Sequence, residues 1–175
     1  MEQTNLLKCK IKTALGNIFV SGGRDYITSV SWEAIIDSRI PDHKGELDWF
    51  ADELFLYLKG ALKVFTGGLY FKNNDPVWLR KPVDKTIPRN LSEIVMKILS
   101  EIPYGETKTY GSIATDAGNK GLARAVGGIC GKNPLIIIVP CHRVIAASSI
   151  GGYSAGLAKK RFLLKIEGLD IQANL

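Results

Sequence analysis

The sequence predicts a mixed α/β protein, of the α+β type, that is divided into two domains. Short apolar runs separated by glycines fill residues 8–38, and helix-like spacings of apolar residues follow. The segment "LRKPVDKTIPRN", residues 79–90, holds two prolines, several charges and few apolar residues, which is typical of a linker. We therefore predict an N-terminal α/β domain over residues 1–85 and a second domain over residues 86–175.

The composition is that of a globular protein without a membrane span or a disulfide framework. Of the 175 residues, 46% are apolar and 23% are charged, and no apolar run approaches the roughly 18 residues that cross a bilayer. The N-terminus lacks an apolar signal-peptide core, so we expect a cytoplasmic protein, or a nuclear one in a eukaryote. Three cysteines at unrelated spacings and two unpaired histidines, His43 and His142, predict neither disulfides nor a metal site.

The net charge of +6 is concentrated in the second domain. Residues 1–85 carry 12 Lys and Arg against 11 Asp and Glu, whereas residues 86–175 carry 11 against 6. This basic surplus favours a polyanionic partner, with nucleic acid as the first candidate, although a merely soluble basic surface explains the charge equally well.

The first domain is expected to consist of strands followed by a helix. "IKTALGNIFVSGG" and "YITSVSW", both within residues 8–38, predict strands joined by turns. "ELDWFADELFLYLKG", residues 46–60, predicts a helix that stops at Gly60. The apolar residues near helical spacing in this segment are Leu47, Phe50, Leu54, Phe55 and Leu58.

The second domain begins with a helix over residues 90–103. Asn90 is its expected cap, and Glu93, three residues on, completes a capping box. Pro103 ends the pattern. One apolar face is formed by Leu91, Ile94, Val95, Ile98 and Leu99.

Two further short helices are expected over residues 110–118 and 121–133, around a glycine-containing turn. This is the outline of a helix-turn-helix, although the signal is weak by itself. The apolar run over residues 135–139 predicts a buried strand that stops at Pro140. A final helix is expected over residues 157–168, with an apolar repeat at Ala158, Phe162 and Ile166.

A thiol, an imidazole and a guanidinium follow the predicted strand in a row, at Cys141, His142 and Arg143. Most buried cysteines are inert, so a structural thiol is one interpretation. Because His142 and Arg143 are costly to bury without partners, an electropositive setting that favours the nucleophilic thiolate is the other. Adjacent residues do not face one another in a strand or helix, so His142 reaches the thiol only through a turn, which Pro140 permits, or a water.

A histidine base needs an acceptor that orients it, usually a carboxylate, and the second domain has six. Glu167 is unusual because it lies at the C-terminal end of its predicted helix, where the helix dipole disfavours a negative charge. A solvated surface glutamate remains the alternative. Arg143 is expected to be a structural or ion-pairing residue.

Four stretches in order resemble the O6-alkylguanine-DNA alkyltransferase family over about residues 90–170. They are "IPYGETKTYGSIA", "ARAVGGICGKNP", "IVPCHRVI" and "GGYSAGLAKKRFLLKIEG", and the PCHRV motif is highly specific. The resemblance implies a ribonuclease-H-like α/β domain at the N-terminus. It also implies a C-terminal winged-helix alkyltransferase domain built around a helix-turn-helix.

The resemblance implies a role for each residue that matches a family motif. Cys141 is the expected nucleophile that takes the alkyl group from guanine O6, and His142 is its general base, acting through a water. Glu167 would orient that histidine, and Asn133 would brace the active-site turn. Tyr110 would donate a proton toward N3 of the departing guanine, which is a poor leaving group as an anion.

The resemblance also implies a substrate pocket and a DNA surface. Tyr153 and Ser154 match the loop that closes over the flipped base, and the Cys141 and Val144 carbonyls would accept from its exocyclic amine. Arg124 matches the arginine that fills the gap left by the extruded nucleotide, from a helix in the minor groove. The other expected DNA contacts are Ser92, Gly111, Asn119, Ala123, Gly127 and Gly128.

The implied function is DNA repair by a single irreversible alkyl transfer from O6-alkylguanine in double-stranded DNA to the protein itself. O4-alkylthymine is a further expected substrate, no cofactor takes part, and the protein is expected to act as a monomer. Cys130 is expected to be packed rather than to remove the product thioether. Ala155 stands where the family frequently has glycine and is expected to trim the pocket for bulky O6 substituents.

Three other classes of protein fit parts of this pattern. A lesion-binding relative without repair activity would lack the nucleophile, so Cys141 argues against it. A hydrolase with a Cys–His–Glu triad would turn over and would leave the "ARAVGG" motif unexplained. A helix-turn-helix regulator would not need the PCHRV motif.

Overall fold

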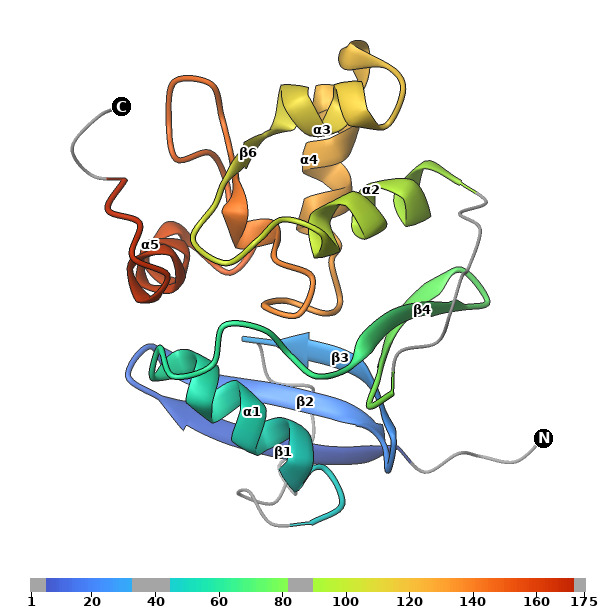
Figure 1. Cartoon of the computed structure of the whole chain (residues 1–175), viewed down its shortest axis with the longest axis vertical. Coiled ribbons are helices and arrows are strands. Elements are labelled where there is room, and N and C mark those ends of the chain that lie inside the picture. The colour runs from blue at the N-terminus through green and yellow to red at the C-terminus, as the bar shows by residue number, and fades with distance from the viewer. Residues whose placement is uncertain (1–5, 33–44, 82–89, 172–175) are drawn as a thin grey trace.

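A computed structural model of the chain describes residues 6–32, 45–81 and 90–171, which form two lobes (Figure 1). Residues 82–89 of the predicted linker, and His43, lie outside the described residues. The boundary between residues 85 and 86 therefore stays a prediction. In the described part of the chain, no helix is long and apolar enough to span a bilayer.

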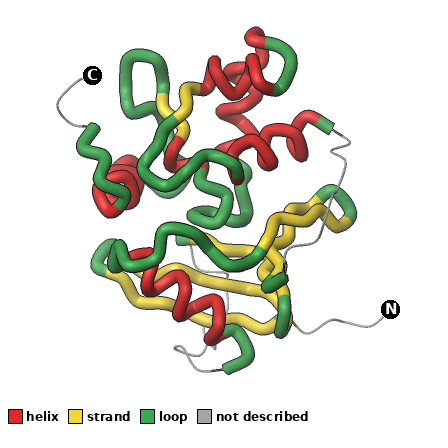
Figure 2. The backbone as a smooth tube through the Cα atoms, in the orientation of Figure 1, coloured by secondary structure: helices red, strands yellow, loops and turns green. Residues whose placement is uncertain are grey.

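The N-terminal lobe is a five-stranded antiparallel sheet with helix α1 (Asp48–Leu58) on one face (Figure 2). The strands predicted within residues 8–38 are confirmed as far as Trp32, but the last hairpin of the sheet was not predicted. Pro76 argues against a strand there, and it is tolerated because β3 pairs only with the residues that follow it. The strand order is β1 (Leu7–Thr13), β2 (Gly16–Gly23), β3 (Tyr26–Ser31), β5 (Asp75–Leu79) and β4 (Gly68–Lys72).

Helix α1 is confirmed. It ends at Leu58, and Gly60, two residues on, has a φ of +72° that suits glycine. Its buried face is not quite the predicted one. Phe50 and Leu54 are fully buried as expected, whereas Phe55 is 49% exposed. Tyr57 is fully buried in its place, since it lies seven residues after Phe50 on the side that faces the C-terminal lobe.

The C-terminal lobe is built on three mutually packed helices, α2 (Leu91–Ser100), α3 (Tyr110–Asp116) and α4 (Ala123–Gly131). The predicted cap is confirmed, because the Asn90 side chain accepts from the Glu93 N–H at 3.1 Å. The predicted pair of short helices is also confirmed. The remaining elements are β6 (Lys108–Thr109), η1 (Lys120–Leu122), η2 (Cys141–Arg143), β7 (Val144–Ile145), which pairs in parallel with β6, and α5 (Leu157–Ile166).

The strand predicted over residues 135–139 is wrong. These residues are buried, but only Leu135 makes a single bridge to β3, and the chain then turns through Ile137, whose φ is +72°. The Asn133 side chain accepts from the Leu135 N–H at 2.9 Å and donates to the Val139 carbonyl at 2.7 Å. These two hydrogen bonds fold the run into a compact turn that buries apolar side chains without extended pairing.

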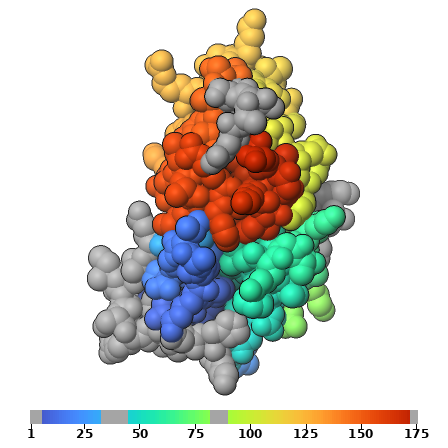
Figure 3. All heavy atoms as spheres, turned by 90° about the vertical axis from the view of Figure 1, so that its left-hand side faces the viewer, coloured from blue at the N-terminus to red at the C-terminus, as the bar shows by residue number. Residues whose placement is uncertain are grey.

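The lobes share one continuous hydrophobic core. Backbone hydrogen bonds join them where Val30 of β3 donates to the Pro134 carbonyl at 2.7 Å and accepts from the Ile136 N–H. Figure 3 shows α5, in red, directly above the N-terminal strands. The repeat expected in α5 does not mark its buried side: Ala158 is exposed, and the buried residues are Lys160, Leu163 and Leu164.

Candidate active site

Cys141 opens the single-turn 3-10 helix η2 directly after Pro140, so the turn that Pro140 predicted is present. The thiol is nearly buried, and the Asn133 amide donates to its sulfur at 3.1 Å as well as to the preceding turn. That turn contains Ile137 in the left-handed region, which costs a β-branched residue roughly 1–3 kcal/mol. The packing and the Asn133 hydrogen bonds that hold the sulfur in place therefore offset the backbone strain at Ile137.

Glu167 is the centre of a buried charged cluster behind the thiol. It caps the C-terminus of α5, and its Oε1 accepts from His142 Nε2 at 2.8 Å. Arg143 donates to both carboxylate oxygens, from Nε to Oε2 and from Nη2 to Oε1, each at 2.9 Å. The Gly105 N–H adds a further bond to Oε2 at 3.1 Å. The surface-glutamate alternative is therefore wrong, and Arg143 neutralises the charge that a helix end disfavours.

These contacts decide the protonation of the cluster. Burial alone would raise the pKa of Glu167, but hydrogen bonds from His142 and Arg143 lower it to about 2. Burial lowers the pKa of His142, although its hydrogen bond with Glu167 opposes this. Because the carboxylate only accepts, His142 Nε2 carries the imidazole proton. Nδ1 has no hydrogen-bond partner among the described residues and keeps its lone pair for a proton.

The thiol is not a thiolate at rest. Burial raises the pKa of Cys141, and the Asn133 hydrogen bond and the Lys160 charge offset this only in part. The expectation of a thiolate-favouring setting is wrong, since Arg143 is paired with Glu167 and His142 is kept neutral. Cys141 therefore needs a base, and Nδ1 of His142, on the next residue of the same turn, is a free one.

Lys160 is a buried cation that the sequence pattern did not reveal. Its Nζ donates to the carbonyls of Val144 and Gly152, and burial lowers the pKa of Lys160 to about 8. The expected substrate contact Val144 thus already has one donor on its carbonyl. In the sequence, Lys160 looks like any solvated lysine, and its only signal is a position two helical turns before Glu167.

A cavity of about 120 Å³ opens beside the thiol. Tyr110 closes one side, its hydroxyl donating to the Gly152 carbonyl at 3.4 Å, and burial raises the pKa of Tyr110 so that it stays protonated. Cys130 is buried, as expected, and it also lines this cavity, whereas Ala155 does not line it. The lining residues are Tyr110, Gly127, Cys130, Gly131, Cys141, Gly152, Tyr153 and Ser154.

The expected DNA contacts lie at or near the exposed surface of the three packed helices. Arg124 projects from α4 and makes no hydrogen bond or ion pair within residues 6–32, 45–81 and 90–171. Gly128 is exposed one residue beyond Gly127, which lines the cavity, so α4 connects the outer surface with the thiol pocket. Asn119 caps η1 through a bond from the Gly121 N–H at 2.9 Å. The first or second residues of α2, α3 and α4 are Ser92, Gly111 and Ala123.

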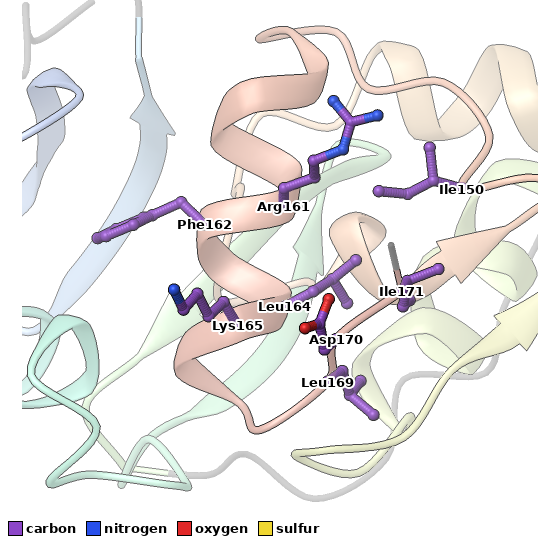
Figure 4. Close-up of a pocket in the computed structure, with 8 residues that line it drawn as sticks. All are labelled: Ile150, Arg161, Phe162, Leu164, Lys165, Leu169, Asp170 and Ile171. Atoms are coloured by element: carbon purple, nitrogen blue, oxygen red, sulfur yellow. The ribbon is translucent and has the colours of Figure 1, made fainter. Parts of the chain in front are cut away.

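A second cavity, of about 180 Å³, lies on the outer side of α5 (Figure 4). Arg161, Leu164 and Lys165 line it together with residues 169–171. None of its lining residues belongs to the cluster around Cys141, so it plays no part in the chemistry at the thiol.

The arrangement has known relatives. Residues 90–169 match the family described as "6-O-methylguanine DNA methyltransferase, DNA binding domain". A methylated-DNA–protein-cysteine methyltransferase of Saccharolobus islandicus is 48% identical over 104 residues, which cover 59% of this chain and 66% of that protein. The crystal structure of Mycobacterium tuberculosis OGT in complex with DNA is 33% identical, with 91% of each chain covered and a TM-score of 0.71. The chain belongs to the O6-methylguanine DNA methyltransferase family.

The family membership accounts for the fold of both lobes. A methyltransferase structure from Pyrococcus kodakaraensis, 22% identical, shares the fold over 93% of this chain with a TM-score of 0.62. The match to the curated Saccharolobus relative spans just under two thirds of that protein's length. The part of the family that its description calls the DNA-binding domain matches residues 90–169, which belong to the C-terminal lobe.

The relatives' names specify a protein cysteine as the methyl acceptor, and the structure distinguishes among the three cysteines here. Cys9 is buried in β1, away from the cavity. Burial raises the pKa of Cys130 to about 12, and no base adjoins it in the sequence. Cys141 alone combines the cavity with a neighbouring histidine.

Proposed function

We propose that this protein repairs O6-alkylguanine, and O4-alkylthymine as a further substrate, in double-stranded DNA by moving the alkyl group to Cys141. The observation that carries the proposal is the position of the Cys141 sulfur, in a cavity bordered by α4 and backed by the buried His142–Glu167 pair. A nucleophile, a base and an orienting carboxylate within one buried cluster is the arrangement that activates a thiol.

In the proposed reaction, Nδ1 of His142 takes the thiol proton of Cys141 through a water. The sulfur then attacks the alkyl carbon, the S–C bond forms, and the C–O6 bond breaks with its electron pair moving into the guanine ring. Tyr110, which burial keeps protonated, donates a proton toward N3 of the ring, and the proton held by His142 returns through solvent to the tyrosine. Glu167 and Arg143 stay fixed as an ion pair throughout.

The target atom lies inside the duplex, so the nucleotide must leave the stack before the sulfur can reach it. Arg124 is the side chain proposed to fill the gap, since it is exposed on the same helix whose inner side borders the cavity. Tyr153 and Ser154, which also line the cavity, would cover the extruded base.

The product is a thioether, and a thiol does not displace an alkyl group from a neutral thioether under these conditions. Cys130, although it lines the cavity, therefore does not regenerate Cys141. We expect one alkyl transfer per molecule, by a monomer, without a cofactor.

The test is the intact mass of the protein after incubation with a duplex that contains one O6-methylguanine. We expect a gain of about 14 Da, limited to one per molecule, in the wild type and in Cys130→Ala, and no gain in Cys141→Ala. Lesion binding without any gain in mass would instead support a non-catalytic lesion-binding protein. Loss of the lesion with unchanged protein mass would show turnover and overturn the single-transfer mechanism.

A further inference from the structure

Tyr57 is a buried hydroxyl from the N-terminal lobe that ends on the carboxylate of the active centre. It lies in the last turn of α1 and is fully buried. Its hydroxyl donates to Glu167 Oε1, and the hydroxyl oxygen also lies 3.2 Å from His142 Nε2. Tyr57 and Glu167 are 110 positions apart in the sequence, so only the docking of the two lobes brings them together.

We propose that Tyr57 is a positioning residue for the alkyl transfer, which holds the Glu167 carboxylate against His142 so that Nδ1 stays free for the thiol proton. The inference rests on the proposed function. It makes the N-terminal lobe a part of the active centre rather than only a scaffold beside it.

The Tyr57 hydroxyl acts as a hydrogen-bond donor, because neither of its two polar neighbours has a proton available to donate to it. His142 Nε2 uses its proton on Glu167, and the carboxylate only accepts. Burial, followed by the charge of Glu167, raises the pKa of Tyr57 well above its ordinary value. Tyr57 therefore remains protonated at neutral pH, and its hydroxyl donates to Oε1.

The ring of Tyr57 is fixed by aromatic neighbours, so its hydroxyl is already oriented toward Glu167. Tyr104 meets the ring edge-on, with centroids 6.0 Å apart and planes at 87°, and Phe65 lies at 5.5 Å. A donor that is rigid before the reaction holds its acceptor with little entropic cost. The Glu167 carboxylate thus accepts from three side chains, Tyr57, His142 and Arg143, in addition to the Gly105 N–H.

This set of hydrogen bonds also affects how strongly His142 holds a proton. Oε1 already accepts from Tyr57, His142 and Arg143, and each donor withdraws negative charge from it. Without the Tyr57 hydroxyl, Oε1 would stabilise an imidazolium more strongly, and the pKa of His142 would rise. The ionisable groups that face His142 from the elements around it are Glu167, Tyr57, Arg143, Lys160 and the neighbouring Cys141. Tyr104 interacts with Glu167 and Arg143 instead.

The matched pair of variants is Tyr57→Phe and Tyr104→Phe. Both remove one hydroxyl from the same aromatic cluster, but the Tyr104 hydroxyl donates to the Ile166 carbonyl at 2.7 Å and not to Glu167. The readout is the pH profile of single-turnover alkylation at Cys141. We expect Tyr57→Phe to shift the low-pH limb to higher pH and to slow the reaction roughly tenfold, part of the 10²–10⁴ that a positioned base contributes. Tyr104→Phe should leave the limb in place.

A second readout is independent of activity. The chain has two histidines, so His43→Gln leaves His142 as the single signal in nitrogen-15 spectra of the imidazole. Tyr57→Phe should raise the titration midpoint of His142, and the shift should vanish in a Glu167→Gln background, because Tyr57 acts through that carboxylate. An unmoved midpoint and an unmoved low-pH limb would overturn the proposal and leave Tyr57 as a packing residue. A raised His142 midpoint in Tyr57→Phe, together with a wild type that gains no mass on the methylated duplex, would instead contradict the proposed function alone.

Discussion

The two lobes bury different kinds of side chain, and the difference separates scaffold from chemistry. Among the described residues and apart from aromatic rings, the N-terminal lobe buries one polar side chain, Ser21. The C-terminal lobe buries six, and all of them except Glu93 surround the thiol. The six are Glu93, Asn133, His142, Arg143, Lys160 and Glu167.

Burial of charge is costly, so the C-terminal lobe stabilises its cluster by mutual pairing rather than by apolar area. Arg143 and Glu167 neutralise each other, His142 stays uncharged, and Lys160 is held by carbonyl groups. The N-terminal lobe is stabilised by apolar contact between α1 and the sheet. The comparison teaches that the reactive groups lie where the fold buries polar and charged side chains. Tyr57 is the residue of the N-terminal lobe that makes a hydrogen bond to this cluster.

Glu167→Gln is expected to have the largest effect, because it leaves the Arg143 guanidinium buried without its counter-charge. Loss of one partner of a buried pair costs about 3–5 kcal/mol of unfolding free energy. Leu54→Ala, in the fully buried face of α1, should cost a similar 2–5 kcal/mol or so by leaving a cavity. Urea unfolding at pH 7 measures both variants, and Glu167→Gln should also lose most alkylation activity.

The pH dependence distinguishes these two variants. The pKa of Glu167 is lowered to about 2 in the folded protein, below its unfolded value of about 4.3. Its contribution is therefore present above the unfolded value and is lost as the pH falls toward 2. The difference between wild type and Glu167→Gln should shrink between pH 5 and about 2.5, whereas the difference for Leu54→Ala should persist. Equal behaviour of the two variants would contradict the contrast between the lobes.

Arg124→Ala is expected to slow alkylation of duplex DNA by roughly thirtyfold without changing the unfolding free energy. Arg124 is exposed and makes no intramolecular ion pair among the described residues, while an extruded base costs a few kcal/mol that a filled gap offsets. Reaction with the free base O6-benzylguanine should not change, because no stack has to be opened. Arg161→Ala, an exposed arginine at the separate cavity of Figure 4, serves as the control. Equal losses with duplex and free base would show that Arg124 acts on the chemistry instead.

Lys160→Met is expected to slow alkylation while leaving the fold as stable as before, or more stable by about 1–2 kcal/mol. The Lys160 charge lowers the pKa of Cys141, so the thiol of the variant should react with iodoacetamide only at higher pH. The pKa of Lys160 is lowered to about 8 in the fold, against about 10.4 unfolded, so its charge opposes folding below these values. Stability of the wild type should therefore rise between pH 8 and 10, and that of Lys160→Met should not.

Cys130→Ala is expected to have the smallest effect. Cys130 lines the cavity beside Cys141, and removal of its sulfur enlarges the space for a bulky O6 substituent. The rate with O6-benzylguanine relative to O6-methylguanine should rise about two- to threefold, which is less than the roughly tenfold or more that one methylene group contributes in a closely fitted pocket. Cys9→Ala, in the N-terminal sheet, should leave that ratio unchanged. An equal response of both variants would remove Cys130 from the pocket wall.

Much of the fold followed from local patterns. Alternating apolar runs predicted β1 to β3, and Asn90 and Gly118 marked helix ends that the structure has at those places. The predictions that failed are those in which a local pattern fits two structures. The run over residues 135–139 is as apolar as a strand, but Asn133 folds it into a turn. Periodicity also could not tell whether Phe55 or Tyr57 faced the core, since both are aromatic. Tyr57 is buried because the C-terminal lobe covers it, whereas Phe55 stays exposed.

The sequence by itself determined which chemical groups this protein has and in which order: the Pro140–Arg143 turn, its cysteine and histidine, and the helices that flank them. Those features depend on residues within a few positions of one another, where spacing and capping act directly. Only the tertiary structure decided that Tyr57 and Arg143 converge on Glu167 and that Lys160 is buried beside the pocket. Burial and pairing are properties of segments up to 110 positions apart, and it is burial that sets the charge of each group and hence the base that Cys141 requires.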